Sequence, residues 1–140
     1  MAYSVPTGNF GDIFAGYMAR KMGLPIEQLI IATNSNDVLH RLMSKNLYEV
    51  RPLQHTITPS MDIAVSSNFE RLLFDLYDRD GKALADLMTT MNKRTETVSL
   101  DEEKLAKARE IFDSLGVDED ATVETMQQVF KETGYLLDPH

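Results

Sequence analysis

Val5-Pro6-Thr7-Gly8-Asn9-Phe10-Gly11-Asp12 joins a short strand-like segment, residues 2–5, to an amphipathic segment of helical period. A strand that turns through glycines into the first turn of a helix is well suited to holding an anion. The first backbone N–H groups of a helix lack partners, and the helix dipole places partial positive charge there. We therefore interpret residues 8–12 as a candidate phosphate-binding loop. The alternative is an ordinary strand-to-helix turn that uses glycine for tight packing.

Each residue of this loop has a property that bears on an anion site. Gly8 and Gly11 can adopt backbone angles closed to other residues and let a phosphate approach the main chain. Asn9 tolerates left-handed geometry and carries an amide donor. Phe10 must pack inward or against a flat ligand, and Asp12 can cap the helix. The spacing matches neither a Walker loop, since no Gly-Lys-Ser/Thr follows, nor the G-x-G-x-x-G dinucleotide motif.

The segments around the loop predict a β-α-β unit. A helical stripe of apolar residues spans residues 12–22, and Gly23 followed by Pro25 ends it. Residues 28–33 form a continuous apolar run, which is typical of a strand buried in a parallel sheet. A right-handed crossover would place the loop at the carboxyl end of the first strand, where open α/β sheets bind ligands. Asn34 follows the second strand at the same edge, and it either forms a turn or lines the ligand pocket.

The second half of the chain has mainly helical patterns. Two Ser-x-x-Glu patterns, at residues 67–70 and 99–102, are typical of capping boxes. The second one predicts a helix that includes Leu115 and ends at Gly116. A last helix is predicted over residues 120–133, with its apolar side chains packed inward against the preceding helix or the sheet.

The segments without a helical period are predicted to be extended. Residues 48–63 contain two prolines and are expected to form a long loop, with one edge strand around residues 55–57. Residues 135–137 are expected to form a third strand or a buried connection.

Composition excludes several classes of protein. A chain of 140 residues with 43% hydrophobic residues suits one domain, or a large piece of one, with a real core. A net charge of −8 argues against a nucleic acid or an acidic membrane surface as a partner. The absence of cysteine excludes disulfides and thiolate metal sites, and no metal site is predicted. No apolar run reaches the roughly 18 residues of a membrane span, and no signal pattern is present, so a cytoplasmic location is expected.

The loop and several later stretches closely resemble threonine synthase, a pyridoxal 5'-phosphate (PLP) enzyme of fold type II. The resemblance is strong over residues 5–73 and looser over residues 82–133. Beyond the loop it rests, in order, on Ala15-Gly16-Tyr17, Lys21-Met22-Gly23-Leu24-Pro25-Ile26, Ile31-Ala32-Thr33-Asn34 with Asn36-Asp37, Pro59-Ser60-Met61-Asp62-Ile63, Ser66-Ser67-Asn68-Phe69-Glu70-Arg71-Leu72-Leu73 and the segment from Tyr135 to His140.

The resemblance implies a lyase of threonine biosynthesis, which converts the small-molecule substrate O-phospho-L-homoserine and water to L-threonine and phosphate. It implies that the loop holds the cofactor phosphate, largely through backbone N–H groups. The residues that match the family's loop are Gly8, Asn9, Phe10, Gly11 and Asp12. The family's Schiff-base lysine, and the hydroxyl residue that meets the pyridine nitrogen, have no counterpart in the chain. No catalytic residue is therefore assigned, and the chain alone is expected to be inactive.

The fold implied is α/β: a β-α-β unit of a parallel sheet with helices, followed by a largely helical region, as part of the large domain of a fold-type-II PLP enzyme. The chain is interpreted as one partial domain over residues 1–140, an internal segment of the enzyme. Residues 1–65 are its cofactor-phosphate-binding part and residues 66–140 its mainly helical part. The alternative function is a non-catalytic α/β module that binds an anion or serves a structural role.

Overall fold

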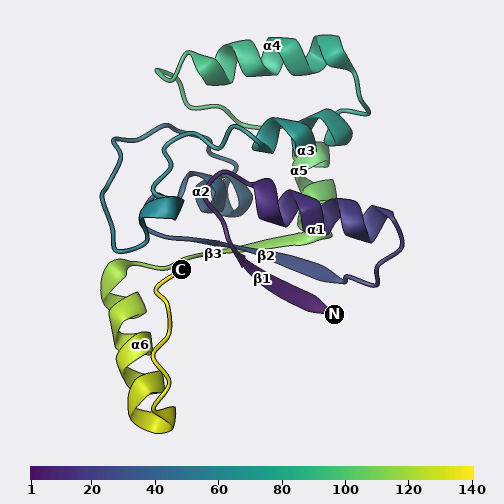
Figure 1. Ribbon diagram of the computed structural model, residues 1–140. Coiled ribbons are helices and arrows are strands. Elements are labelled where there is room, and N and C mark those ends of the chain that lie inside the picture. Colours follow the sequence, from purple (N-terminus) through teal and green to yellow (C-terminus); the bar gives the residue numbers. More distant parts are fainter.

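A three-stranded parallel sheet forms the centre of the molecule in the computed structural model, which describes residues 1–140 (Figure 1). The strands are β1 (Ala2–Pro6), β2 (Gln28–Thr33) and β3 (Phe112–Gly116), in the order β1-β2-β3, and both pairs are parallel. Parallel neighbours need a crossover connection, which places helices on a face of the sheet. The predicted α/β class with a parallel sheet is thereby confirmed.

The predicted β-α-β unit is present. Helix α1 (Gly11–Lys21) connects β1 to β2, and Gly23 follows it with a φ of 105°, a conformation that glycine adopts without strain. In β2, Leu29, Ile31 and Thr33 are buried. Every residue of β1 pairs with a residue of β2. The loop of residues 7–10, which follows β1, therefore lies at the carboxyl end of the strands.

Five more α-helices and one short 3-10 helix complete the chain. They are α2 (Val38–Lys45), η1 (Pro59–Met61), α3 (Phe69–Leu76), α4 (Gly81–Asn92), α5 (Glu102–Arg109) and α6 (Glu119–Thr133). None of these helices has the length and apolar character needed to cross a lipid bilayer.

Helix α3 carries the cleanest apolar face and lies at the centre of the core. Its residues Phe69, Leu72, Leu73 and Leu76 are buried, and the helix contacts α1, α4 and α5. Its start differs from the predicted capping box, because Asn68 takes the N-cap position and no side chain caps the helix. The second predicted box, before α5, also fails to form, since the N-cap residue is Asp101 and its side chain caps nothing.

The predicted helix through Leu115 is wrong. Helix α5 ends at Arg109, and residues 112–116 form β3 beside β2. The physical reason is tertiary packing. Phe112 is buried among the aromatic rings of Phe10 and Tyr17, with centroids 5.7 Å away in each case. A short apolar run fits a helix or a strand equally well, and pairing with β2 decides for the strand.

Two other predicted strands are also absent. Residues 55–57 lie in an irregular loop, and residues 135–137 form no strand. The third strand of the sheet comes instead from residues 112–116, whose backbone groups pair with those of β2. Tyr135 and Leu136 are exposed.

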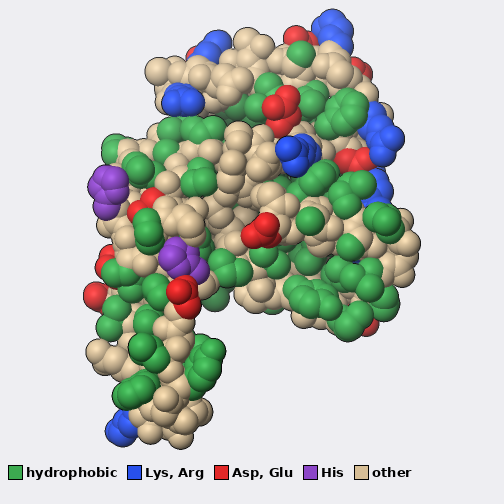
Figure 2. Space-filling view, in the orientation of Figure 1, with side chains coloured by type: hydrophobic (Ala, Val, Ile, Leu, Met, Phe, Trp, Pro, Cys, Tyr) green, Lys and Arg blue, Asp and Glu red, His purple; other side chains and the backbone are tan.

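Helix α6 lies apart from the other helices. Figure 1 shows α1 to α5 on one side of the sheet, while α6 extends away from the end of β3. The predicted inward packing of α6 is wrong, because none of its residues is buried and Phe130 is 53% exposed. Figure 2 shows hydrophobic side chains on the surface along α6 and also around the N-terminus near the end of α1.

Candidate functional site

The loop between β1 and α1 lines a cavity of about 450 Å³ at the carboxyl end of the sheet. Its walls come from segments far apart in the sequence: the loop itself, η1, the residue before α3, and the end of the chain. The lining residues are Pro6, Thr7, Gly8, Asn9, Phe10, Gly11, Asp12, Ile13, Ser60, Met61, Asn68 and His140. All five residues predicted from the sequence, Gly8 to Asp12, are therefore brought to one cavity.

A row of backbone N–H groups in this loop has no acceptor within the chain. The Thr7 N–H donates to the Ala32 carbonyl at 2.7 Å, and the Phe14 N–H donates to the Phe10 carbonyl at 3.1 Å. Between them, the N–H groups of residues 8–13 donate no hydrogen bond to any other group of the chain. Since the first turn of α1 also carries the positive end of the helix dipole, the row is suited to binding an anion.

The left-handed residue of the loop is Phe10. It has φ 66° and ψ 5°, whereas neither Gly8 nor Gly11 has a positive φ. The sequence predicts the special backbone conformation at the two glycines, and this prediction is wrong. Phe10 is only 1% exposed and its ring meets the ring of Phe69 edge-on, with centroids 5.1 Å apart. The phenyl group thus packs into the core and anchors the loop.

The two glycines let other groups come close to the backbone of the loop. A Cβ atom on Gly8 would lie 3.1 Å from the Met61 Cα and 3.2 Å from the Ile63 Cδ1, so a larger residue would push the η1 segment away. A Cβ atom on Gly11 would meet only the Asn68 Nδ2, at 3.5 Å. Gly8 is therefore needed for packing, while Gly11 leaves the start of α1 open to the cavity.

Asn9 ties the loop to the start of α3. Its Oδ1 accepts hydrogen bonds from the Ser67 N–H at 2.6 Å, the Ser67 Oγ at 2.8 Å and the Asn68 N–H at 3.3 Å. The Ser67 hydroxyl is thus used in this bond and does not cap α3. Asn9 fixes the position of the loop through its amide oxygen.

Asp12 does not cap α1. It is the second residue of the helix, its side chain is exposed, and it makes no hydrogen bond or ion pair. The N-cap position belongs to Phe10, which has no side-chain capping group. Asp12 nevertheless lines the cavity.

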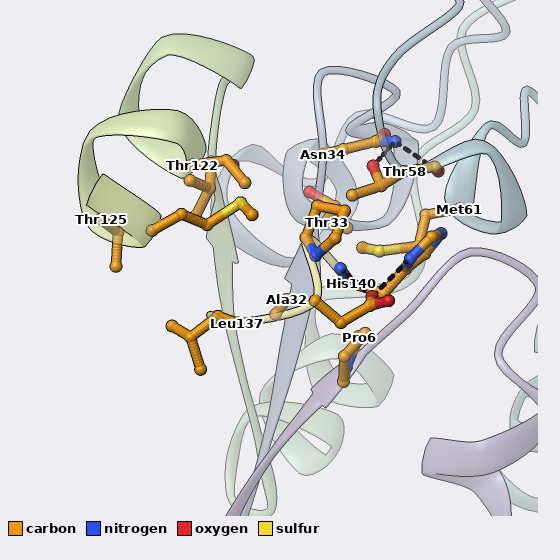
Figure 3. Close-up of a pocket in the computed structure, with 14 residues that line it drawn as sticks. Pro6, Ala32, Thr33, Asn34, Thr58, Met61, Thr122, Thr125, Leu137 and His140 are labelled. Carbon is orange, nitrogen blue, oxygen red and sulfur yellow. Dashed lines mark hydrogen bonds and ion pairs between the residues drawn. The ribbon is translucent and has the colours of Figure 1, made fainter. Parts of the chain in front are cut away.

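A second cavity of about 290 Å³ adjoins the carboxyl ends of the strands (Figure 3). It lies between β2, the long loop, α6 and the last residues of the chain. His140 lines both cavities, and its Nδ1 lies 2.9 Å from the Asp138 Oδ1. The lining residues are Pro6, Ala32, Thr33, Asn34, Thr58, Met61, Val117, Thr122, Thr125, Met126, Leu137, Asp138, Pro139 and His140.

Asn34 lines the second cavity and also organises the long loop. Its Nδ2 donates to the Thr58 Oγ1 at 2.9 Å and to the Asp62 Oδ1 at 2.8 Å. Burial acts to raise the pKa of Asp62, but hydrogen bonds from Thr56 and Asn34 outweigh it and hold that pKa below its usual value. This polar cluster ties the residues on either side of η1, Thr58 and Asp62, to the end of β2. Both readings of Asn34 from the sequence, turn former and pocket residue, are thus compatible with its position.

No lysine lines either cavity. The Lys21 ammonium is paired with Asp75, and the Lys104 Nζ lies 2.7 Å from the Asp78 Oδ2. The four cavity residues that lie far from the loop in the sequence are Ser60, Met61, Asn68 and His140. They lie in stretches that carry the family resemblance, but only the fold brings them to the loop.

These features define a class of protein: an α/β protein whose first β-α loop presents free N–H groups at the carboxyl edge of a parallel sheet. No protein-family model matches the chain. Over all its 140 residues the chain is 56% identical to threonine synthase of Pseudomonas aeruginosa and covers 30% of that protein.

Solved structures give the same result. The crystal structure of PLP-bound threonine synthase from Brucella melitensis matches with a TM-score of 0.93 and 49% identity, over 100% of this chain and 30% of that one. The crystal structure of yeast threonine synthase matches with a TM-score of 0.89 and 39% identity, over 98% of this chain and 30% of that one. The resemblance seen in the sequence is confirmed: the chain is homologous to threonine synthases and spans about 30% of their length.

Proposed function

We propose that the chain is the part of a PLP-dependent threonine synthase that holds the cofactor phosphate. The complete enzyme would convert O-phospho-L-homoserine and water to L-threonine and phosphate. The observation that carries the proposal is the row of N–H groups over residues 8–13, which lack acceptors within the chain and line a cavity. The PLP-bound relative from Brucella melitensis, similar along this whole chain, supports the choice of cofactor.

The residues of the loop fit a phosphate group. Hydrogen bonds from N–H groups to a charged oxygen are short and strong, and a helix N-terminus adds the favourable end of its dipole. Gly11 begins α1 and has no side chain to cover these groups. Phe10 and Asn9 hold the loop in place before a ligand arrives, so little conformational entropy is lost on binding.

PLP, when bound, supplies a conjugated ring that stabilises negative charge on substrate carbon atoms. The role of this chain is to bind and orient the cofactor through Gly8, Asn9, Phe10, Gly11 and Asp12. The lysine that would hold the cofactor aldehyde belongs, in this proposal, to another part of the enzyme, because no lysine of the chain lines the cavity. The chain alone would therefore not make threonine.

Phosphate binding by the 140-residue chain tests the proposal. In a ¹⁵N NMR titration with inorganic phosphate, and then with PLP, the amide resonances of residues 8–13 should shift. Gly11→Val adds a branched side chain at the start of α1, beside the cavity. It should weaken binding by tenfold or more, because a hydrogen bond to a charged group is worth about 1.5–3 kcal/mol.

Gly81→Val is the matched control. Gly81 is also the first residue of a helix, α4, and a Cβ atom there would contact nothing within 4 Å. This variant should bind phosphate as the parent does. A folded Gly11→Val chain with the parent's affinity would show that the loop does not hold the phosphate.

A further inference from the structure

Asn68 lies beside the loop although it is 59 residues from Asn9 in the sequence. It lines the same cavity as residues 7–13. Its Nδ2 is the nearest atom to the position that a Cβ atom of Gly11 would take, at 3.5 Å. The amide nitrogen of Asn68 therefore lies next to the first N–H groups of α1.

The position of Asn68 at the start of α3 does not explain why the residue is an asparagine. Asparagine is a favoured N-cap residue because its side-chain oxygen can accept from the first turn of a helix. The Asn68 side chain caps nothing, and its backbone is already helical, with φ −78° and ψ −9°. Neither its Nδ2 nor its Oδ1 makes a hydrogen bond within the chain. The amide thus has free donors at the cavity and no structural use for them.

The backbone of Asn68 is held in place by the loop itself. The Asn9 Oδ1 accepts from the N–H groups of Ser67 and Asn68 and from the Ser67 hydroxyl. The ring of Phe69, the next residue, packs edge-on against Phe10. These contacts fix the start of α3 against the start of α1, so the Asn68 side chain is placed before any ligand binds.

We propose that Asn68 is a further ligand of the phosphate, and that its Nδ2 donates to a phosphate oxygen beside the Gly11 N–H. The inference rests on the function proposed above and extends the site from one loop to two elements. An amide contributes a directed donor without adding charge, which suits a position already surrounded by N–H groups.

Removal of the amide without adding charge separates this role from a structural one. Asn68→Ala loses the donor, and Asn68→Gly also loses it but keeps a residue that is tolerated at an N-cap position. If Asn68 serves only α3, both variants should keep the parent's phosphate affinity. If it is a ligand, both should bind phosphate more weakly while the chain stays folded.

The test is the same NMR titration of the 140-residue chain with inorganic phosphate at fixed ionic strength. Asn68→Ala should bind about tenfold more weakly, the loss expected for one hydrogen bond to a charged group. Asn68→Asp should bind more weakly still, with a thermal midpoint equal to the parent's or higher. Asn92→Asp, which adds the same charge at an exposed position that ends α4, should bind as the parent does.

The outcomes are distinct. If Gly11→Val loses binding but Asn68→Ala and Asn68→Gly retain the parent's affinity, the role of Asn68 is overturned and the loop assignment stands. A drop in Asn92→Asp as large as the drop in Asn68→Asp would mean that the aspartate variant reports net charge only, and the two uncharged variants then decide. If the parent shows no shift at residues 8–13 with phosphate, both proposals fall. Should Asn68→Ala not fold, Asn68→Gly decides, since glycine is tolerated at an N-cap position and also lacks the donor.

Discussion

Phe10 determines the shape of the candidate phosphate loop. A left-handed conformation costs a residue with a side chain about 1–2 kcal/mol, whereas burying a phenylalanine side chain contributes about 1.5–3 kcal/mol. With Phe10 at 1% exposure and in contact with two other rings, packing outweighs the strain. The loop is therefore shaped by the core and not by its ligand.

Ser66 provides a test of the packing next to this loop. Its hydroxyl is buried and has no hydrogen-bond partner, which costs about 1–3 kcal/mol for such a group. Ser66→Ala removes the unpaired hydroxyl and should leave the free energy of unfolding unchanged or raise it, measured by urea denaturation.

Ser114→Ala is the comparison for that measurement. The Ser114 Oγ lies 2.9 Å from the His40 Nδ1, so this variant loses a hydrogen bond and should be destabilised by about 0.5–1.5 kcal/mol. A loss above about 1 kcal/mol in Ser66→Ala would mean that its hydroxyl is paired in solution.

The sequence predicts which residues form the loop but not the cause of its geometry. Glycine spacing points to Gly8 and Gly11, yet the positive φ belongs to Phe10. Long-range packing against Phe69 and Phe112 permits it, and no local pattern encodes that contact. The place of Asn68 in the cavity is not predictable from the sequence for the same reason, since its partner Asn9 is far away in the sequence.

At the scale of elements, α1 and α3 are joined by a polar contact at the edge of the core. The Tyr17 hydroxyl and the Lys21 ammonium of α1 both donate to the Asp75 carboxylate of α3. Burial and the hydrogen bond to Asp75 raise the pKa of Tyr17 to about 12. Burial acts to raise the pKa of Asp75 as well, but the hydrogen bonds from Lys21 and Tyr17 outweigh it and hold that pKa below its usual value.

This contact should make stability fall at both ends of the pH scale. Asp75 has a lowered pKa in the folded state, so its contribution is present above the ordinary value of 3.8 and is lost as the pH falls below it. Tyr17 has a raised pKa, so its contribution is present below 10.0 and is lost as the pH rises toward about 12. Urea denaturation at pH 3, 7 and 11 measures both effects.

Two conservative variants isolate the two groups. Asp75→Asn should lose less stability than the parent between pH 7 and pH 3, and Tyr17→Phe should lose less between pH 7 and pH 11. Each variant should be less stable than the parent at pH 7, because a hydrogen bond to a charged group, worth about 1.5–3 kcal/mol, is removed or weakened. A gap between parent and Asp75→Asn that is equal at pH 7 and pH 3 would contradict the assignment.

Helical periodicity predicts most helices but not which elements they pack against. The apolar stripe on α3 is predicted correctly, because a long regular pattern of this period fits only a helix. The run from Ile111 to Leu115 was assigned to a helix because a short apolar run fits both periods, and only pairing with β2 distinguishes them. On α6 the apolar stripe exists, but Val123 and Phe130 face a shallow apolar cavity beside Ile57 and Leu136 instead of a core.

At the scale of the whole molecule, the sheet is covered by helices on one side only. Parallel sheets are normally buried on both faces, yet Leu115 on β3 is 56% exposed. The outer edges of β1 and β3 have no neighbouring strand. This architecture agrees with a chain that spans about 30% of the length of its relatives. The division of function at residue 65 stays a prediction.

The distribution of lysines gives the last prediction. None of the seven lysines lines either cavity. Hydrogen bonds to Asp86 and Asp78 raise the pKa values of Lys82 and Lys104, which makes their neutral amines scarcer still. The aldehyde of PLP should therefore select no single lysine of this chain.

After incubation with PLP and reduction with borohydride, peptide mapping should find label spread over several lysines, with no threonine formed from O-phosphohomoserine. Gly11→Val should give the same labelling pattern, since the phosphate loop does not direct the aldehyde to any lysine. Stoichiometric labelling of one lysine, together with turnover, would show that the chain carries the catalytic amine after all.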